Sequence, residues 1–133
     1  MSDHQAKITR EFPELVTAVI GTMEDKKAFD VVVLDLRNAG VFADFFVVGS
    51  GQTKRQVKAI GDAIETHLKE RGMRPSHIEG YGNAEWILMD CFDVIVHVFT
   101  KNTRQQYELE RLWGNSTLFE ITFPDKTTAP INP

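Results

Sequence analysis

The sequence of 133 residues contains a single cysteine, Cys91. One cysteine excludes an intramolecular disulfide and any zinc site built from several cysteines. Basic residues are also in the minority, 15 against 19 acidic ones, which gives a formal net charge of −4. Such a chain offers no large positive field to hold a phosphate backbone. Naked nucleic acid is therefore a poor candidate for the main partner.

Long hydrophobic runs are missing as well, because no apolar stretch approaches the length of a membrane-spanning helix. The first five residues, Met-Ser-Asp-His-Gln, lack the apolar core of a signal peptide, and Glu11 and Glu14 argue against a transit peptide. We therefore expect a cytoplasmic protein. With 42% hydrophobic and 26% charged residues, the chain is long enough for one domain with a substantial core.

Periodicity predicts three helices, at 13–27, from Thr53 to about Gly72, and at 103–113. It predicts five strands, at 29–36, 43–49, 77–79, 85–90 and 93–99. Thr53 and Gln56 have the spacing of a capping box, and the short connection between the first two strands favours antiparallel pairing. We expect a single α/β domain with a mixed five-stranded sheet flanked by about three helices.

Domain limits follow from the same pattern. Residues 1–12 are predicted to be a flexible N-terminus, 13–117 the domain, and 118–133 a mobile C-terminal extension that includes three prolines. Three short helices would leave part of the sheet uncovered, and that apolar area could accept a partner or a second copy of the chain.

The segment Gly49-Ser-Gly-Gln-Thr-Lys54 lies between a strand and a helix, where a phosphate-binding loop would lie. Its spacing does not match a Walker A loop, so a tight turn followed by a helix cap is the favoured interpretation. A nucleotidyltransferase-like enzyme using Ser50, Asp90 and Asp93 is the competing hypothesis. Asp90 and Asp93 are three residues apart rather than two, which does not match the paired carboxylates of two-metal chemistry.

Other polar residues give weaker evidence of a functional site. His97 lies among apolar strand residues with no third group to complete a catalytic or metal site, which favours a hydrogen-bonded histidine in the fold or at an interface. Lys54, Arg55 and Lys58 could contact RNA phosphate or could form a solvated surface, and the pattern does not separate these alternatives.

Tryptophan offers the clearest indication of an interface. Trp86 shares its strand face with Leu88 and Asp90, and an aromatic residue beside a carboxylate is typical of a binding hot spot. Trp113 follows Leu109 and Leu112 at helical spacing and is predicted to pack inside.

Several segments together closely resemble the ribosomal silencing factor family, also called the Iojap family. They are 43–60, Glu79-Gly80, Trp86-Ile-Leu-Met-Asp90, Asp93-Val-Ile-Val-His-Val-Phe99 and Tyr107-Glu-Leu-Glu-Arg-Leu-Trp113. The resemblance covers roughly residues 13 to 113. It departs at Phe92, where the family usually has glycine, and at Asn115, where aspartate is frequent.

The resemblance implies an α/β fold related to nucleotidyltransferases without their catalytic carboxylates, and it implies no enzymatic activity and no cofactor. It also implies binding to the large ribosomal subunit through its protein 14, at the intersubunit face, with possible contact to ribosomal RNA. Subunit joining and translation would then be blocked under nutrient limitation, and the free protein would be a homodimer. Pattern and resemblance together predict these partner-binding residues: Trp86, Leu88, Asp90, Asp93, His97, Arg104, Tyr107 and Arg111.

Overall fold

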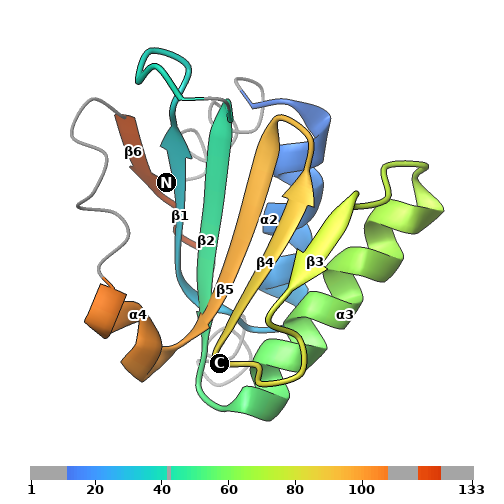
Figure 1. The fold of residues 1–133 in the computed structure, drawn as a ribbon, viewed down its shortest axis with the longest axis vertical. Coiled ribbons are helices and arrows are strands. Elements are labelled where there is room, and N and C mark those ends of the chain that lie inside the picture. The colour runs from blue at the N-terminus through green and yellow to red at the C-terminus, as the bar shows by residue number, and fades with distance from the viewer. Residues whose placement is uncertain (1–11, 42, 108–116, 124–133) are drawn as a thin grey trace, which may run out of the picture.

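Six strands form one mixed sheet in the computed structural model, which describes residues 12–41, 43–107 and 117–123 (Figure 1). The strands are β1 (Phe29–Asp35), β2 (Phe45–Gly51), β3 (His77–Glu79), β4 (Trp86–Cys91), β5 (Val94–Thr100) and β6 (Thr117–Glu120). Their order in the sheet is β3-β4-β5-β2-β1-β6, with β2 and β5 parallel and all other neighbours antiparallel. The predicted mixed α/β domain and the antiparallel pairing of β1 with β2 are confirmed.

The predicted number of five strands is wrong, because β6 pairs antiparallel with β1 along the edge of the sheet. Its four residues are mostly exposed, so they show no alternation from which a strand could be predicted. β6 extends across the predicted boundary at residue 118, and the Ile121 amide then donates to the Val31 carbonyl at 2.9 Å. Residues 124–133 lie outside the described part of the chain.

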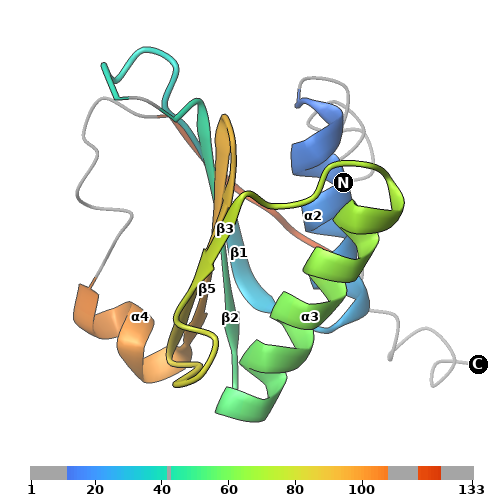
Figure 2. The same cartoon turned by 45° about the vertical axis from the view of Figure 1, so that its right-hand side comes forward.

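Helices lie on both faces of the sheet (Figure 2). α2 (Glu14–Asp25) and α3 (Lys54–Glu70) cover one face, and α4 (Lys101–Tyr107) lies on the other. α3 begins as predicted: the Thr53 hydroxyl accepts from the Gln56 amide at 3.1 Å, and Gln56 Oε1 accepts from the Gln52 amide at 2.6 Å. α4 begins two residues earlier than predicted, since Thr100 Oγ1 accepts from the Thr103 amide at 3.4 Å. Its predicted continuation to Trp113 lies outside the described residues.

Apolar residues alternate between the two faces of the sheet and so build two clusters. Val33, Val47 and Val96 contribute to the larger one, beneath α2 and α3. The cluster on the opposite face contains these buried residues: Val32, Leu34, Leu36, Ala43, Phe46, Val48, Ile95 and Phe99. That face is therefore well packed along β1, β2 and β5, while Trp86 and Leu88 on β4 remain half-buried. Among the described residues, β4 therefore contributes apolar area that a partner could cover, in addition to the exposed side chains of Phe92 in the β4–β5 turn and Leu118 on β6.

The packed part of the chain includes Phe12, one residue before the predicted start of the domain. Phe12 is buried and meets Phe45 and Phe119 edge-on, with ring centroids 5.9 Å and 5.2 Å away. Among the described residues, no helix combines the length and the apolar character needed to cross a membrane.

Candidate partner-binding surface

Trp86, Leu88 and Asp90 project from the same face of β4, as their spacing predicts, and each is half-buried. The Trp86 indole lies over the Phe99 ring with a centroid distance of 4.9 Å, and its Nε1 donates to His97 Nδ1 at 3.0 Å. Ring contact and hydrogen bond together fix the orientation of the indole. A tryptophan held in this way presents apolar area without losing much side-chain entropy when a partner binds.

His97 lies on β5, opposite Leu88, and only 3% of it is exposed. Because Nδ1 accepts from Trp86, the ring proton is on Nε2, which is buried and makes no hydrogen bond. Burial lowers the pKa of His97 from 6.5 to about 4. The histidine is therefore neutral at physiological pH, and its Nδ1 accepts the hydrogen bond that holds the Trp86 indole in place.

Acidification should destabilise the protein through His97. The pKa is lower in the folded state than in the unfolded one, so folding favours the neutral ring, and stability is complete above pH 6.5 and decreases as the pH falls towards 4. We expect the free energy of unfolding to fall by about 2 kcal/mol between pH 6.5 and about pH 5, at about 1.4 kcal/mol per pH unit. Urea unfolding at several pH values measures this loss.

The control is His97→Asn, whose amide oxygen can accept from Trp86 but does not titrate. Its stability should depend much less on pH over the same range. If the free energy of unfolding fell equally steeply with pH in the variant and in the parent protein, groups other than His97 would cause the loss of stability.

β4 and β5 are joined by a two-residue turn, Phe92-Asp93. Asp90 Oδ1 accepts from the Phe92 amide at 3.1 Å, and the Asp93 carbonyl accepts from the amides of Asp44 and Phe45 at 2.7 Å and 3.1 Å. Phe92 has φ 70°, the left-handed conformation that glycine adopts most easily, and is 69% exposed. The turn thus keeps a backbone suited to glycine although it carries phenylalanine.

Phe92→Gly should therefore stabilise the fold. Relief of the left-handed strain contributes about 1 kcal/mol, and little packing is lost because the ring is mostly exposed. Phe92→Ala is the matched control, since it removes the ring but keeps the Cβ that causes the strain. Urea denaturation should rank glycine above alanine, and a glycine variant no more stable than the alanine variant would contradict the explanation.

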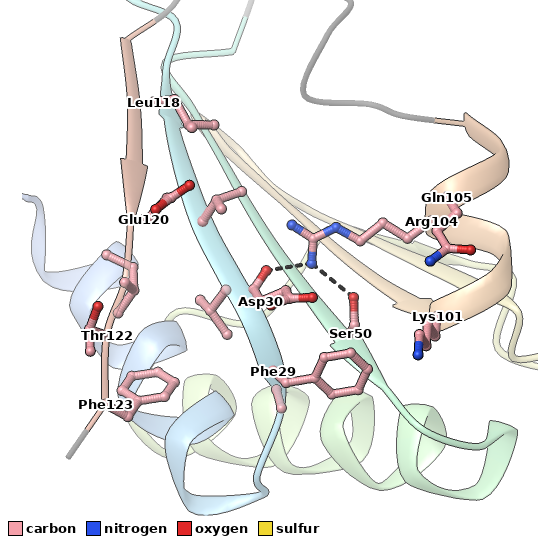
Figure 3. Close-up of a pocket in the computed structure, with 14 residues that line it drawn as sticks. Phe29, Asp30, Ser50, Lys101, Arg104, Gln105, Leu118, Glu120, Thr122 and Phe123 are labelled. Atoms are coloured by element: carbon pink, nitrogen blue, oxygen red, sulfur yellow. Dashed lines mark hydrogen bonds between the residues drawn. The ribbon is translucent and has the colours of Figure 1, made fainter. Parts of the chain in front are cut away.

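Arg104 projects from α4 back towards the sheet, and 9% of it is exposed. Its Nη1 donates to Ser50 Oγ at 2.8 Å and to the Asp30 carbonyl (Figure 3). These contacts hold α4 against β1 and β2. Asp30 was not singled out from the sequence, because only a contact between distant segments gives it a role.

The structure does not bring together the residues of the enzyme hypothesis. Ser50 pairs with Phe99 and Asp90 pairs with Ile95. Four residues of β5 separate these positions, which is about 13 Å at 3.3 Å per residue. Within the described ranges, no three His, Cys, Asp or Glu residues are grouped so that they could hold a metal ion.

The last two predicted partner-binding residues lie where the described part of the chain ends. The Tyr107 backbone ends α4, while its side chain and all of Arg111 lie outside the described structure. Cys91 is buried, and burial raises the pKa of its thiol to about 12, which agrees with a structural residue.

The basic segment at the start of α3 also makes internal contacts. Lys54 Nζ lies 3.5 Å from Glu85 Oε2, and Lys58 Nζ lies 5.3 Å from the centre of the Tyr81 ring. Part of the local positive charge is therefore balanced within the chain.

Comparison with known proteins identifies the family. Residues 9–132 match the family described as "Ribosomal silencing factor during starvation". A protein of Halalkalibacterium halodurans named ribosomal silencing factor RsfS is 39% identical over 108 residues, which cover 81% of this chain and 92% of that one. A crystal structure of a protein from Bacillus halodurans has a TM-score of 0.72 and 37% identity, over 81% of this chain and 98% of that chain.

A more distant relative is a mitochondrial protein of the mouse. The mouse protein named mitochondrial assembly of ribosomal large subunit protein 1 is 29% identical over 101 residues, which cover 74% of this chain and 44% of that protein. With the family match extending over nearly the whole sequence, the chain belongs to the ribosomal silencing factor family.

Proposed function

We propose that this protein binds the large ribosomal subunit at its intersubunit face, through large-subunit protein 14. Bound there, it blocks subunit joining and represses translation when nutrients are scarce. Membership of the silencing factor family supports a ribosomal partner. The name of the mouse relative supports the large subunit. The structural observation that carries the proposal is the half-buried, rigidly held Trp86 on β4.

The contact surface in this proposal consists of Trp86, Leu88, Asp90 and Asp93. Trp86 and Leu88 supply an apolar centre, and the two carboxylates supply a negatively charged rim at the β4–β5 turn. An apolar centre with a polar rim is the usual anatomy of a protein interface. The rim favours a partner surface that carries positive charge.

The other predicted residues act on this surface in different ways. His97 contributes by supporting Trp86, because its own ring is buried. Arg104 contributes by fixing α4, because its guanidinium bonds inside the fold. Tyr107 and Arg111, which follow Arg104 along the chain, complete the proposed set.

Binding rather than catalysis is the proposed mode of action, and the kinship to nucleotidyltransferases remains a prediction about fold ancestry. Ser50 is buried and lies far along the sheet from Asp90, which gives a catalytic role no geometric support. We further propose that the free protein is a cytoplasmic homodimer. The mass in solution, measured by light scattering, tests the dimer.

Sedimentation through sucrose gradients tests which ribosomal subunit the protein binds. We expect the protein to sediment with purified large subunits and not with small subunits, because its contact surface is matched to one ribosomal protein. Equal recovery in both fractions, or in neither, would refute the proposal.

Charge variants in the same experiment test the surface. Asp90→Asn keeps an oxygen for the Phe92 amide and removes only the charge, and Asp93→Asn likewise changes charge without bulk. Each should weaken binding by about 1 to 2 kcal/mol if it faces a cation. Asp25→Asn, an exposed residue at the end of α2 on the opposite face, is the control and should leave binding unchanged.

A further inference from the structure

The β4–β5 turn carries the most exposed large apolar side chain among the described residues. Phe92 is 69% exposed, against 43% for Tyr81 and 44% for Leu118, and it belongs to neither hydrophobic cluster. Of the two turn residues only Phe92 has a positive φ, 70°, as the first residue of a type II′ turn does, and glycine is preferred at that position. The ring thus contributes little to the fold and lies where the backbone disfavours it.

The backbone of this turn is held in place. Asp90 Oδ1 accepts from the Phe92 amide at 3.1 Å, and the Asp93 carbonyl accepts from the amides of Asp44 and Phe45 at the end of the sheet where β2 begins (Figure 1). A side chain on a backbone held in this way needs little further ordering when a partner binds. Strained residues that the surrounding structure holds in place occur preferentially at functional sites.

Two carboxylates lie beside the ring along the chain. Asp93 is exposed and Asp90 is half-buried, and among residues 12–41, 43–107 and 117–123 neither takes part in an ion pair. Arg37, a basic residue at the same end of the sheet, is bound to Asp35 through Nε at 2.9 Å and Nη2 at 2.6 Å. The face of an aromatic ring attracts a cation, and so does a carboxylate. The turn therefore combines two kinds of group that prefer the same ligand.

We propose that Phe92, together with Asp90 and Asp93, receives an arginine side chain of the large-subunit protein that the Trp86 surface contacts. The inference rests on the proposed function and extends its contact surface into the turn, because Asp90 shares a face with Trp86 and bonds to the Phe92 amide. A guanidinium is planar, so it can stack on the ring while it donates to the neighbouring carboxylates. RNA phosphate would be repelled by the same carboxylates.

Titration of purified large subunits with the full chain tests the proposal through variants of Phe92. Phe92→Gly should bind about tenfold more weakly than the parent protein, because the stacking and the apolar contact are both lost. Its fold should be at least as stable, since the left-handed conformation suits glycine, so unfolding cannot explain weaker binding. Phe92→Tyr keeps the ring face and should bind within about twofold of the parent protein, whereas Phe92→Leu keeps apolar bulk without a ring and should bind about fivefold more weakly.

Leu118→Ala is the control for exposed apolar area. Leu118 lies on β6, four strands from β4 and about 19 Å away at 4.8 Å per strand, so its truncation should leave binding unchanged.

The inference alone is overturned if Phe92→Gly or Phe92→Leu binds large subunits as tightly as the parent protein. It is also overturned if light scattering shows that Phe92→Gly disrupts the homodimer while subunit binding is unchanged, because the ring would then contact a second copy of the chain. A parent protein that does not bind large subunits overturns the proposed function as well.

Discussion

Trp86→Ala is expected to reduce both the stability of the fold and its affinity for large ribosomal subunits. Truncation removes the stacking on Phe99 and the hydrogen bond to His97, and it leaves both nitrogens of a buried imidazole without a partner. We expect a loss of about 3 kcal/mol in the free energy of unfolding, the lower end for a large aromatic residue because Trp86 is only half-buried. The affinity should fall by about 2 kcal/mol, as for an interface hot spot.

A matched control separates the loss of stability from the loss of affinity. Ile64→Ala creates a cavity beneath α3, on the opposite face of the sheet, and should cost a similar 2 to 5 kcal/mol of stability. Urea unfolding and subunit binding are measured on the same samples, under conditions where each variant is folded. If Ile64→Ala lost as much affinity as Trp86→Ala, the role of Trp86 in binding would be excluded, because destabilisation alone would then explain both.

Trp86→Phe gives a finer comparison. Phenylalanine can still stack on Phe99 but cannot donate to His97, so the imidazole would again lack a partner at Nδ1. Its stability should lie between those of the parent protein and Trp86→Ala. The difference between the two variants then measures how much of the effect comes from the ring surface.

The sequence predicts those parts of the fold that are determined by residues close together along the chain. The α3 boundaries follow from the hydroxyl of Thr53 and from Gly72, which has φ 75°. The two faces of β4 follow from strict alternation, so the placement of Trp86 with Leu88 and Asp90 needs no tertiary information. The strand pairing of β1 with β2 follows from the short connection between them.

Features that depend on distant contacts could not be predicted. β6 exists because β1 offers it an unpaired edge, and its own four residues carry no pattern. Arg104 resembles one member of an exposed charged helix face in the sequence, yet the bulge at Asp30 and the hydroxyl of Ser50 draw its guanidinium inside. The hydrogen bond between Trp86 and His97 likewise joins two strands, and no spacing along the chain reveals it.

Gly80 shows how closely the candidate surface depends on the connection that precedes it. Residues 80–85 join β3 to β4, and the Ala84 amide donates to the Gly80 carbonyl at 2.9 Å within this turn. Gly80 has φ 83°, and a Cβ built there would lie 2.0 Å from the Trp86 carbonyl oxygen. The backbone of Gly80 therefore sets where β4 begins and where the indole emerges.

Gly80→Ala is accordingly expected to be among the most damaging single-methyl changes in the chain. The added Cβ meets the rigid Trp86 backbone rather than a flexible side chain, and the left-handed conformation is unfavourable for alanine. Strain and overlap together should lower the free energy of unfolding by about 4 kcal/mol and weaken subunit binding, because relief of the overlap displaces Trp86. Gly82→Ala, two residues later, is the control, since a Cβ there meets nothing within 4 Å. Urea denaturation of both variants measures the difference in stability. Similar denaturation midpoints for Gly80→Ala and Gly82→Ala would mean that β4 can shift freely and that Gly80 does not position Trp86.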